Sequence, residues 1–293
     1  TLIDFTIRRD FPHLGEPSPD VIVEWVREVC RRTAEMIVHW MRVGFVHGVM
    51  NTDNMTISGE TIDYGPCAFI DSYNPAAVYS SIDKQGRYSL QNQPPIAQWN
   101  LVRLAESLLP LIDSDQDYGV ELVTEVLNEF PDKYSLNWLQ GMLCKLGISN
   151  SRENDLELVN DLLAELHHQK VDYTLFFRDL AKLLSNDKET VLEHFANTMT
   201  IEKWLARWHD RLTYDEFTSV ERIEFMNLVN PNYIPRNHKV EEAIEAVIRG
   251  EDYSKFEILL DVLSHPYQEQ PGMNEYSQPA PNEFGAYKTF CGT

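Results

Sequence analysis

Two short polar segments in the first quarter of the sequence have residue types that suit metal-assisted chemistry. Asp53 and Asn54 are adjacent, and Asp63 follows nine residues after Asn54. Mg²⁺ prefers hard oxygen ligands and is usually held by one or two protein groups together with phosphate oxygens. A carboxylate and an amide oxygen on neighbouring loops supply such ligands. Asn54 and Asp63 are therefore the expected metal pair.

The spacing of these residues is typical of kinase-like phosphotransferases. Their catalytic loop reads H-x-D-x-x-x-x-N, and a second Asp in D-F-G holds the metal on the phosphates. Here Asn54 lies seven residues after His47, and Asp63-Tyr64-Gly65 takes the place of D-F-G. Val49 occupies the position of the kinase base, which argues against ordinary phosphorylation of a hydroxyl. Asp53 could replace that base or adjust the metal site, and the residues alone leave both open.

The elements that must position these loops can be read from the flanking sequence. Ser18-Pro19-Asp20 has the order N-cap, N1, N2, and the apolar residues that follow recur at helical spacing, which predicts a long buried helix ending near Gly44. Between residues 45 and 70, the β-prone pieces 56–58 and 61–62 are separated by Gly59. This pattern predicts a loop, a small β-hairpin and a second loop.

The sequence after Pro95 reads almost entirely as helix, so the predicted fold class is mainly α. The expected helices span residues 96–111, 117–130, 133–146, 153–167, 172–184, 187–198, 201–212, 238–249 and 253–264. Proline, Gln, Asn and Gly dominate from residue 265 onward, which predicts an extended or mobile tail.

Composition and charge exclude several classes of protein. The chain has 25 Lys and Arg against 46 Asp and Glu, a net charge of −21, which argues against nucleic acid as a partner. It has no apolar run of 18 residues, and charged residues interrupt the first twenty positions, so neither a membrane span nor a signal peptide is predicted. Four widely spaced cysteines without a CxxC pair favour a reducing, cytoplasmic setting.

Longer stretches around the two loops resemble the selenoprotein O family. The resemblance is carried by residues 43–55 (Val43 through Met55), 61–66, 86–88, 92–94, 99–101, 230–237 and 290–293, so it extends over nearly the whole chain. It implies a pseudokinase fold that binds ATP in an inverted orientation and transfers AMP to Ser, Thr or Tyr hydroxyls of proteins. By the same resemblance Asp53 would accept the proton, and Asn54 and Asp63 would bind the metal, Mg²⁺ or Mn²⁺. Asp63 would also help to bind ATP, the substrate.

The resemblance also implies an organisation. The chain would be the C-terminal portion of the family, which needs its own N-terminal lobe to grip ATP, and its location would be mitochondrial if the source were eukaryotic. We expect a kinase-like C-terminal lobe with a small β-hairpin at the metal loops in residues 1–94, a helical extension in 95–265 and an extended tail in 266–293. The family ends in a redox residue, which corresponds to Cys291, and Cys67 could pair with it.

Two other functions stay open at this point. A protein-kinase-type phosphotransferase is weakened by Val49 but not excluded. A pseudokinase scaffold would keep the loops only for their shape and would bind partners through the helical extension.

Overall fold

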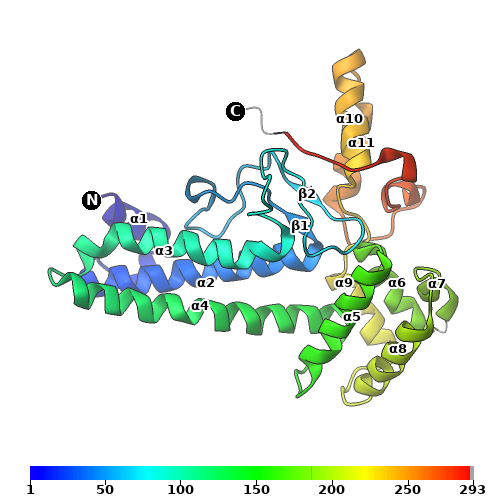
Figure 1. The fold of residues 1–293 in the computed structure, drawn as a ribbon, viewed down its shortest axis with the longest axis horizontal. Coiled ribbons are helices and arrows are strands. Elements are labelled where there is room, and N and C mark those ends of the chain that lie inside the picture. The colour runs from blue at the N-terminus through cyan, green and yellow to red at the C-terminus, as the bar shows by residue number, and fades with distance from the viewer. Residues whose placement is uncertain (186, 291–293) are drawn as a thin grey trace.

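The computed structural model describes residues 1–185 and 187–290, and it confirms a mainly helical fold (Figure 1). The helices are α1 (Leu2–Asp10), α2 (Pro19–Val43), α3 (Gln93–Ile112), α4 (Gln116–Lys145), α5 (Asp155–Gln169), α6 (Tyr173–Leu180), α7 (Lys188–Leu192), α8 (Met199–Leu212), α9 (Ser219–Val229), α10 (Asn237–Gly250) and α11 (Ser254–Ser264). Strands β1 (Phe45–Val46) and β2 (Ala68–Phe69) form the one sheet of the described residues.

Helix α2 has the boundaries that the sequence predicts. The Ser18 side chain accepts a hydrogen bond from the Val21 amide, Pro19 takes the first helical position, and Gly44 ends the helix in the left-handed conformation at φ 72°. One face of the helix is buried, and it lies along α3 and α4 (Figure 1). The chain therefore leaves α2 at a fixed point and, after β1, enters the first polar loop, which carries Asp53 and Asn54.

The predicted β-hairpin is wrong in its position. Residues 55–62 contribute only a single antiparallel bridge, between Met55 and Thr61. The sheet instead pairs Phe45 with Phe69 and Val46 with Ala68 in antiparallel order, so its strands enclose both polar loops. The phenyl rings of Phe45 and Phe69 pack edge to face with centroids 5.3 Å apart, which stabilises this long-range pairing.

Helix α4 corrects a second prediction, because it continues through Pro131 where two helices are expected. Proline lacks the amide hydrogen that an interior position needs, so its cost must be offset elsewhere. The residues before Pro131, such as Val126 and Phe130, pack with α1, α2 and α3 in one hydrophobic cluster. Those after it, such as Leu143, belong to a second cluster with α5, α6 and α8. Burial at both ends keeps α4 continuous.

Helix α9 is absent from the predicted set, although its N-terminus carries a readable signal. Thr218 and Glu221 form a capping box in which each side chain bonds to the backbone of the other residue. The buried Arg222 of this helix donates hydrogen bonds to the carbonyls of Gly147 and Leu212. Helix α9 thus ties the end of α4 to the end of α8.

The last described residues return to the polar loops, as Figure 1 shows for the red end of the chain. Thr289 pairs with Ser80 in a parallel bridge, its amide donates to the Tyr79 carbonyl, and its hydroxyl donates to the Pro66 carbonyl at 2.7 Å. The tail is extended apart from two short 3-10 turns, at Asn274–Tyr276 and Asn282–Phe284. Cys291 lies outside the described residues.

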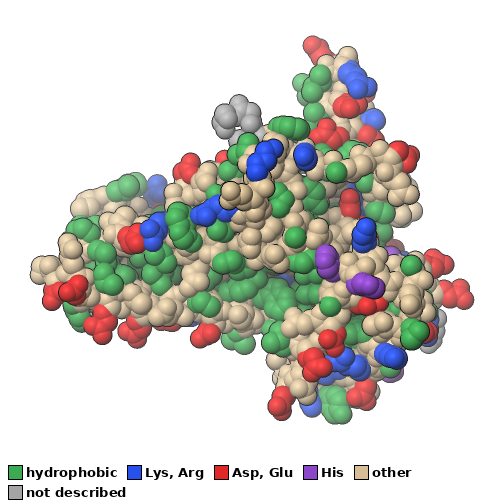
Figure 2. All heavy atoms as spheres, viewed as in Figure 1, with side chains coloured by type: hydrophobic (Ala, Val, Ile, Leu, Met, Phe, Trp, Pro, Cys, Tyr) green, Lys and Arg blue, Asp and Glu red, His purple; other side chains and the backbone are tan. Residues whose placement is uncertain are grey.

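Acidic side chains are spread over the face shown in Figure 2, along the outer edge of the α2–α4 layer and over α5 and α8, while Lys and Arg occur in small groups. Hydrophobic side chains are also visible on the projecting α10–α11 hairpin, where Ile248 is 78% exposed. Across residues 1–185 and 187–290, none of the helices is both long and apolar enough to cross a bilayer.

Candidate active site

Side chains of α3 form hydrogen bonds with the backbone of the first polar loop. The Gln93 amide bridges the loop, because its Oε1 accepts from the His47 amide at 2.9 Å and its Nε2 donates to the Phe45 carbonyl at 2.9 Å. Two turns further on, Asn100 donates from Nδ2 to the Met50 carbonyl at 3.0 Å. Both side chains are buried, so they satisfy backbone groups that the irregular loop cannot pair by itself.

His47 is a structural member of the site. Its ring is fully buried and stacks on Trp40 with centroids 5.1 Å apart. The Val49 amide donates to Nδ1 at 3.3 Å, so the proton belongs on Nε2, which donates to the Ile62 carbonyl at 2.8 Å. Burial lowers the pKa of His47, which agrees with a neutral ring. His47 therefore joins the first loop to the segment that precedes Asp63.

The two loops also touch through their backbones. Gly48 has φ +83°, and a Cβ atom built there would lie 2.6 Å from the Pro66 carbonyl oxygen. Real Cβ atoms do not approach an oxygen so closely, so only glycine fits at this contact. The structure thus brings the Asp53-Asn54 loop and the Asp63 loop into direct contact, as their kinase-like spacing predicts.

The two ends of the Asn54 side-chain amide have different surroundings. Its Nδ2 donates to the Val49 carbonyl at 2.9 Å, which assigns the amide orientation. Among the residues that the structure describes, none donates to its Oδ1. Residues Thr52–Asn54 form a short 3-10 turn that presents this side chain. Val49 itself is buried, so the position of the kinase base is an apolar core residue here.

The two carboxylates of the site are exposed. Asp63 has φ +52°, a left-handed conformation in which Asp and Asn are enriched among non-glycine residues, and its Oδ1 accepts from the Gly65 amide at 3.4 Å. Asp53 lies in the 3-10 turn beside Asn54, and within the described residues its carboxylate has no hydrogen bond or ion pair. An unengaged carboxylate is available to accept a proton.

The donor set fits Mg²⁺ on chemical grounds. The free Oδ1 of Asn54 and the exposed carboxylate of Asp63 are hard oxygen donors, and phosphate and water oxygens would have to complete the coordination. Within residues 1–185 and 187–290 there is no group of three or more His, Cys, Asp or Glu that could hold a metal alone. Two such donors are too few to hold Mg²⁺ without oxygens from another molecule.

Cys67 lies near the loops but in a protected place. Burial raises the pKa of its thiol to about 11, which disfavours the thiolate that exchange chemistry needs. The neighbouring Pro66 carbonyl accepts a hydrogen bond from the Thr289 hydroxyl, so the tail reaches this part of the site. The predicted pairing of Cys67 with Cys291 lies outside the described residues and stays a prediction.

The residues that hold the site in place are not among the predicted site residues. Besides Gln93 and Asn100, the buried Arg236 bonds to the carboxylates of Asp71 and Asp172, each at 2.6 Å. The next residue, Asn237, donates to the Phe69 carbonyl of β2 at 2.9 Å. In the sequence these residues stand out only as polar residues in an apolar helix or as members of the stretches that resemble the family. Neither pattern specifies which residue they contact.

Comparison with known proteins gives a consistent set of relatives. A family model described as protein adenylyltransferase SelO matches residues 1–264. A protein nucleotidyltransferase YdiU from Rhizobium etli is 48% identical over 295 residues, a match that covers 100% of this chain and 59% of that relative. The relative of the same name from Bacillus cytotoxicus is 46% identical over 293 residues, covering 100% of this chain and 58% of that relative.

The chain therefore spans somewhat less than three fifths of the length of the curated relatives it matches. That the matched part is the C-terminal portion of the family stays a prediction.

Proposed function

Because the chain belongs to the SelO family of protein adenylyltransferases, as its sequence predicts, we propose that its two polar loops catalyse metal-dependent transfer of AMP from ATP to Ser, Thr or Tyr hydroxyls of proteins. The observation that carries the proposal is the pairing of the loops. Asn54 keeps a free amide oxygen, and the Asp63 loop is held against the Asn54 loop at the contact of Gly48 with Pro66.

Each residue has one role in the proposed reaction. Asn54 and Asp63 would hold Mg²⁺ or Mn²⁺, which when bound neutralises phosphate charge and orients the nucleotide. Asp53 accepts the proton of the incoming hydroxyl, whose oxygen forms a bond to the α-phosphorus. The bond from that phosphorus to the bridging oxygen of the β-phosphate breaks, and pyrophosphate leaves.

The proposal includes an architecture. Residues 1–94 would be the catalytic core of a protein-kinase-like lobe, 95–265 a helical extension and 266–293 a wrapping tail. Helix α3 crosses the boundary at residue 94. Gln93 lies before this boundary and Asn100 after it, and both side chains bond to the first polar loop. The partners are ATP, protein substrates and an N-terminal lobe of the same protein, which would supply the remaining contacts to the triphosphate.

The test compares ATP labelled at the α-phosphate with ATP labelled at the γ-phosphate. The enzyme is used as the chain alone and as a fusion to the part of the Rhizobium etli relative that the chain does not match. Asp63→Asn is the informative variant, because Asn tolerates the left-handed backbone at φ +52° while removing the charge. Asp132→Asn, at an exposed position of α4, is the matched control.

The outcomes separate three functions. Label from the α-phosphate alone, lost in Asp63→Asn and kept in Asp132→Asn, is the result expected for AMP transfer. Label from the γ-phosphate would make the protein a phosphotransferase despite Val49. No label from either position, with fold and partner binding intact in Asp63→Asn, would favour a scaffold and overturn the proposal.

A further inference from the structure

A cavity of about 540 Å³ lies between the last turn of α2, the two strands and the loop of Asp63. Thr61 and Tyr64, on either side of Asp63 in the sequence, form part of its wall. Aromatic rings form much of the rest, from Trp40, Phe45, Phe69 and Tyr267. Among the described residues, no acidic side chain contributes to this wall. The cavity therefore suits an occupant with an apolar body.

Arg42 brings a positive charge to the wall. His39, Arg42 and Val43 all line the cavity and lie three and four residues apart, so this face of α2 is turned toward it. Within residues 1–185 and 187–290, the Arg42 guanidinium forms no ion pair and donates no hydrogen bond. Only its Nε is fully enclosed, so the two terminal nitrogens remain accessible. The wall thus carries a guanidinium whose donors are unused.

The missing counter-ion is unexpected in this chain. Cations that are removed from water normally have a carboxylate partner, and the chain has 46 Asp and Glu against 25 Lys and Arg. Lys145 of α4 adds a second charge nearby, because it is 2% exposed and, within the described residues, forms no ion pair. Burial lowers the pKa of Lys145, and the Arg42 charge lowers it further. An anion at Arg42 would relieve this positive potential.

The charge available at the wall fits a monoanion. The Lys145 ammonium lies 4.2 Å from the centroid of the Phe177 ring and 5.0 Å from that of Tyr173, so ring faces already stabilise it. Partial desolvation and the Arg42 charge lower the pKa of His39 below 6.5, so its ring is neutral above pH 7. One guanidinium is left for an occupant, and its planar fork matches the two oxygens of a carboxylate.

We propose that this cavity binds a small organic carboxylate, whose oxygens accept from Arg42 and whose apolar body lies among the aromatic rings of the wall. The inference does not depend on AMP transfer. Packing holds Arg42 in place for this role, because a Cβ atom built at Gly141 of α4 would lie 2.6 Å from Arg42 Cδ. A side chain whose stem is fixed in this way loses little entropy when a ligand binds.

The test uses ligand-observed fluorine NMR with this chain alone. The first probe, 4-fluorophenylacetate, has the anion and the ring, and 4-fluorophenylacetamide has the same shape without the charge. Acetate is a competitor that has the anion but no ring. We expect saturable binding of the carboxylate probe in the millimolar range, as is reasonable for so small a ligand. The amide should bind about ten-fold more weakly, the size of a hydrogen bond to a charged group, and acetate at equal concentration should not displace the carboxylate probe.

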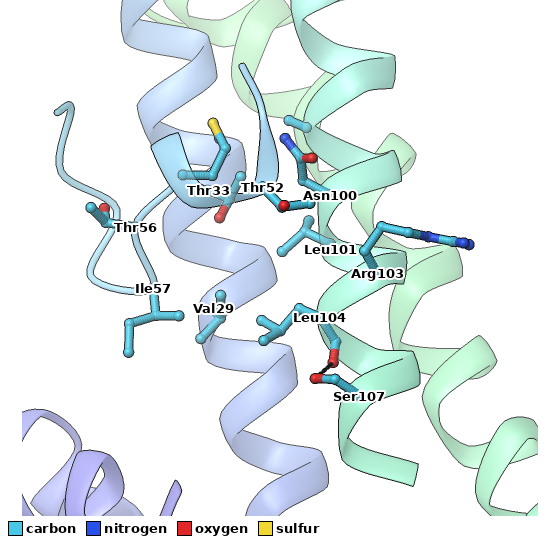
Figure 3. Close-up of a pocket in the computed structure, with 12 residues that line it drawn as sticks. Val29, Thr33, Thr52, Thr56, Ile57, Asn100, Leu101, Arg103, Leu104 and Ser107 are labelled. Carbon is cyan, nitrogen blue, oxygen red and sulfur yellow. Dashed lines mark hydrogen bonds between the residues drawn. The ribbon is translucent and has the colours of Figure 1, made fainter. Parts of the chain in front are cut away.

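Protein variants decide whether binding takes place in this cavity. Arg42→Met keeps an apolar stem over Gly141, so it should lower the affinity for the carboxylate to that for the amide without reducing stability in urea. Arg103→Met is the matched control and should bind as the native chain does. Arg103 pairs with Glu106 at 2.7 Å and extends away from a different cavity, of about 280 Å³, in Figure 3. His39→Trp, at an exposed position of the wall, fills space and should weaken both probes.

Each outcome decides the proposal. A carboxylate preference that is lost in Arg42→Met and kept in Arg103→Met supports it. No saturable binding, equal affinity for the two probes, or a preference that survives Arg42→Met overturns it. If Arg42→Met does not fold, His39→Trp decides, because carboxylate binding that this substitution leaves unchanged lies elsewhere and also overturns the proposal. AMP transfer is measured separately, so failure of one proposal is distinguishable from failure of the other.

Discussion

The contact between Gly48 and Pro66 leads to a prediction about how the two loops are held together. Gly48→Ala should destabilise the fold for two separate reasons. A residue with a Cβ atom at φ +83° costs about 1–2 kcal/mol in backbone strain. The added Cβ atom would also lie 2.6 Å from the Pro66 carbonyl oxygen, so one loop must move, and such overpacking costs a further ~1–3 kcal/mol.

Gly272 offers a matched control for this substitution. It has φ +82°, nearly the same as Gly48, but a Cβ atom built there meets nothing within 4 Å. Gly272→Ala should therefore show the backbone cost alone, about 1–2 kcal/mol. The difference between the two variants isolates the contact between the loops.

Urea unfolding of both variants provides the measurement, with the free energy of unfolding extrapolated to water. We expect Gly48→Ala to lose about 2–5 kcal/mol in total and to lose more than Gly272→Ala. Metal-dependent nucleotide binding should weaken only in Gly48→Ala, because only that substitution separates Asn54 from Asp63. Equal losses of stability in the two variants, with unchanged nucleotide binding, would refute the close approach of the loops.

Three further predictions concern buried groups near the site. Arg236→Met leaves the carboxylates of Asp71 and Asp172 without their cation, so it should cost about 3–5 kcal/mol in urea unfolding, and less when Asp172→Asn is combined with it. Burial lowers the pKa of His47 below 6.5, so the unfolded state binds more protons there, and stability should be complete above about pH 6.5 and fall below it, with a smaller slope in His47→Asn. Burial raises the pKa of Cys67 from 9.0 to about 11, so at pH 8 its alkylation by iodoacetamide should be about 100-fold slower in the native protein than in urea; equal rates would contradict the burial.

Local sequence signals predicted the parts of the fold that depend on local chemistry. Ser18, Pro19 and Gly44 set the ends of α2 through capping and backbone preference, and both features act within a few residues. The kinase-like spacing placed Asn54 and Asp63 on adjoining loops for a similar reason, since the intervening segment is short. Their roles in metal binding stay predictions.

The remaining features depend on contacts between distant residues. Pro131 is a strong local signal for a helix end, yet packing on both sides keeps α4 continuous. The strand pair consists of two residues on each side. Its register depends on the pairing of Phe45 with Phe69, two residues that lie far apart in the sequence. No local pattern predicts that Gln93 supports the first polar loop, because its partners lie 46 and 48 residues earlier in the sequence.

The backbone of the first loop shows why substitutions at its polar residues must be interpreted separately. Three side-chain amides, those of Gln93, Asn54 and Asn100, donate to its carbonyls at Phe45, Val49 and Met50. Asn54 is therefore both a support and a candidate metal ligand, and any substitution that removes its Nδ2 donor also leaves the Val49 carbonyl unpaired. A loss of activity at that position would combine a displaced loop with a lost ligand. Within residues 1–185 and 187–290, Asp63 supports its own loop only through a 3.4 Å contact with the Gly65 amide, which Asn can preserve. Asp63→Asn therefore changes the charge at the proposed metal position with the least change in structure, and its effect on turnover is the more direct measure of metal-assisted chemistry.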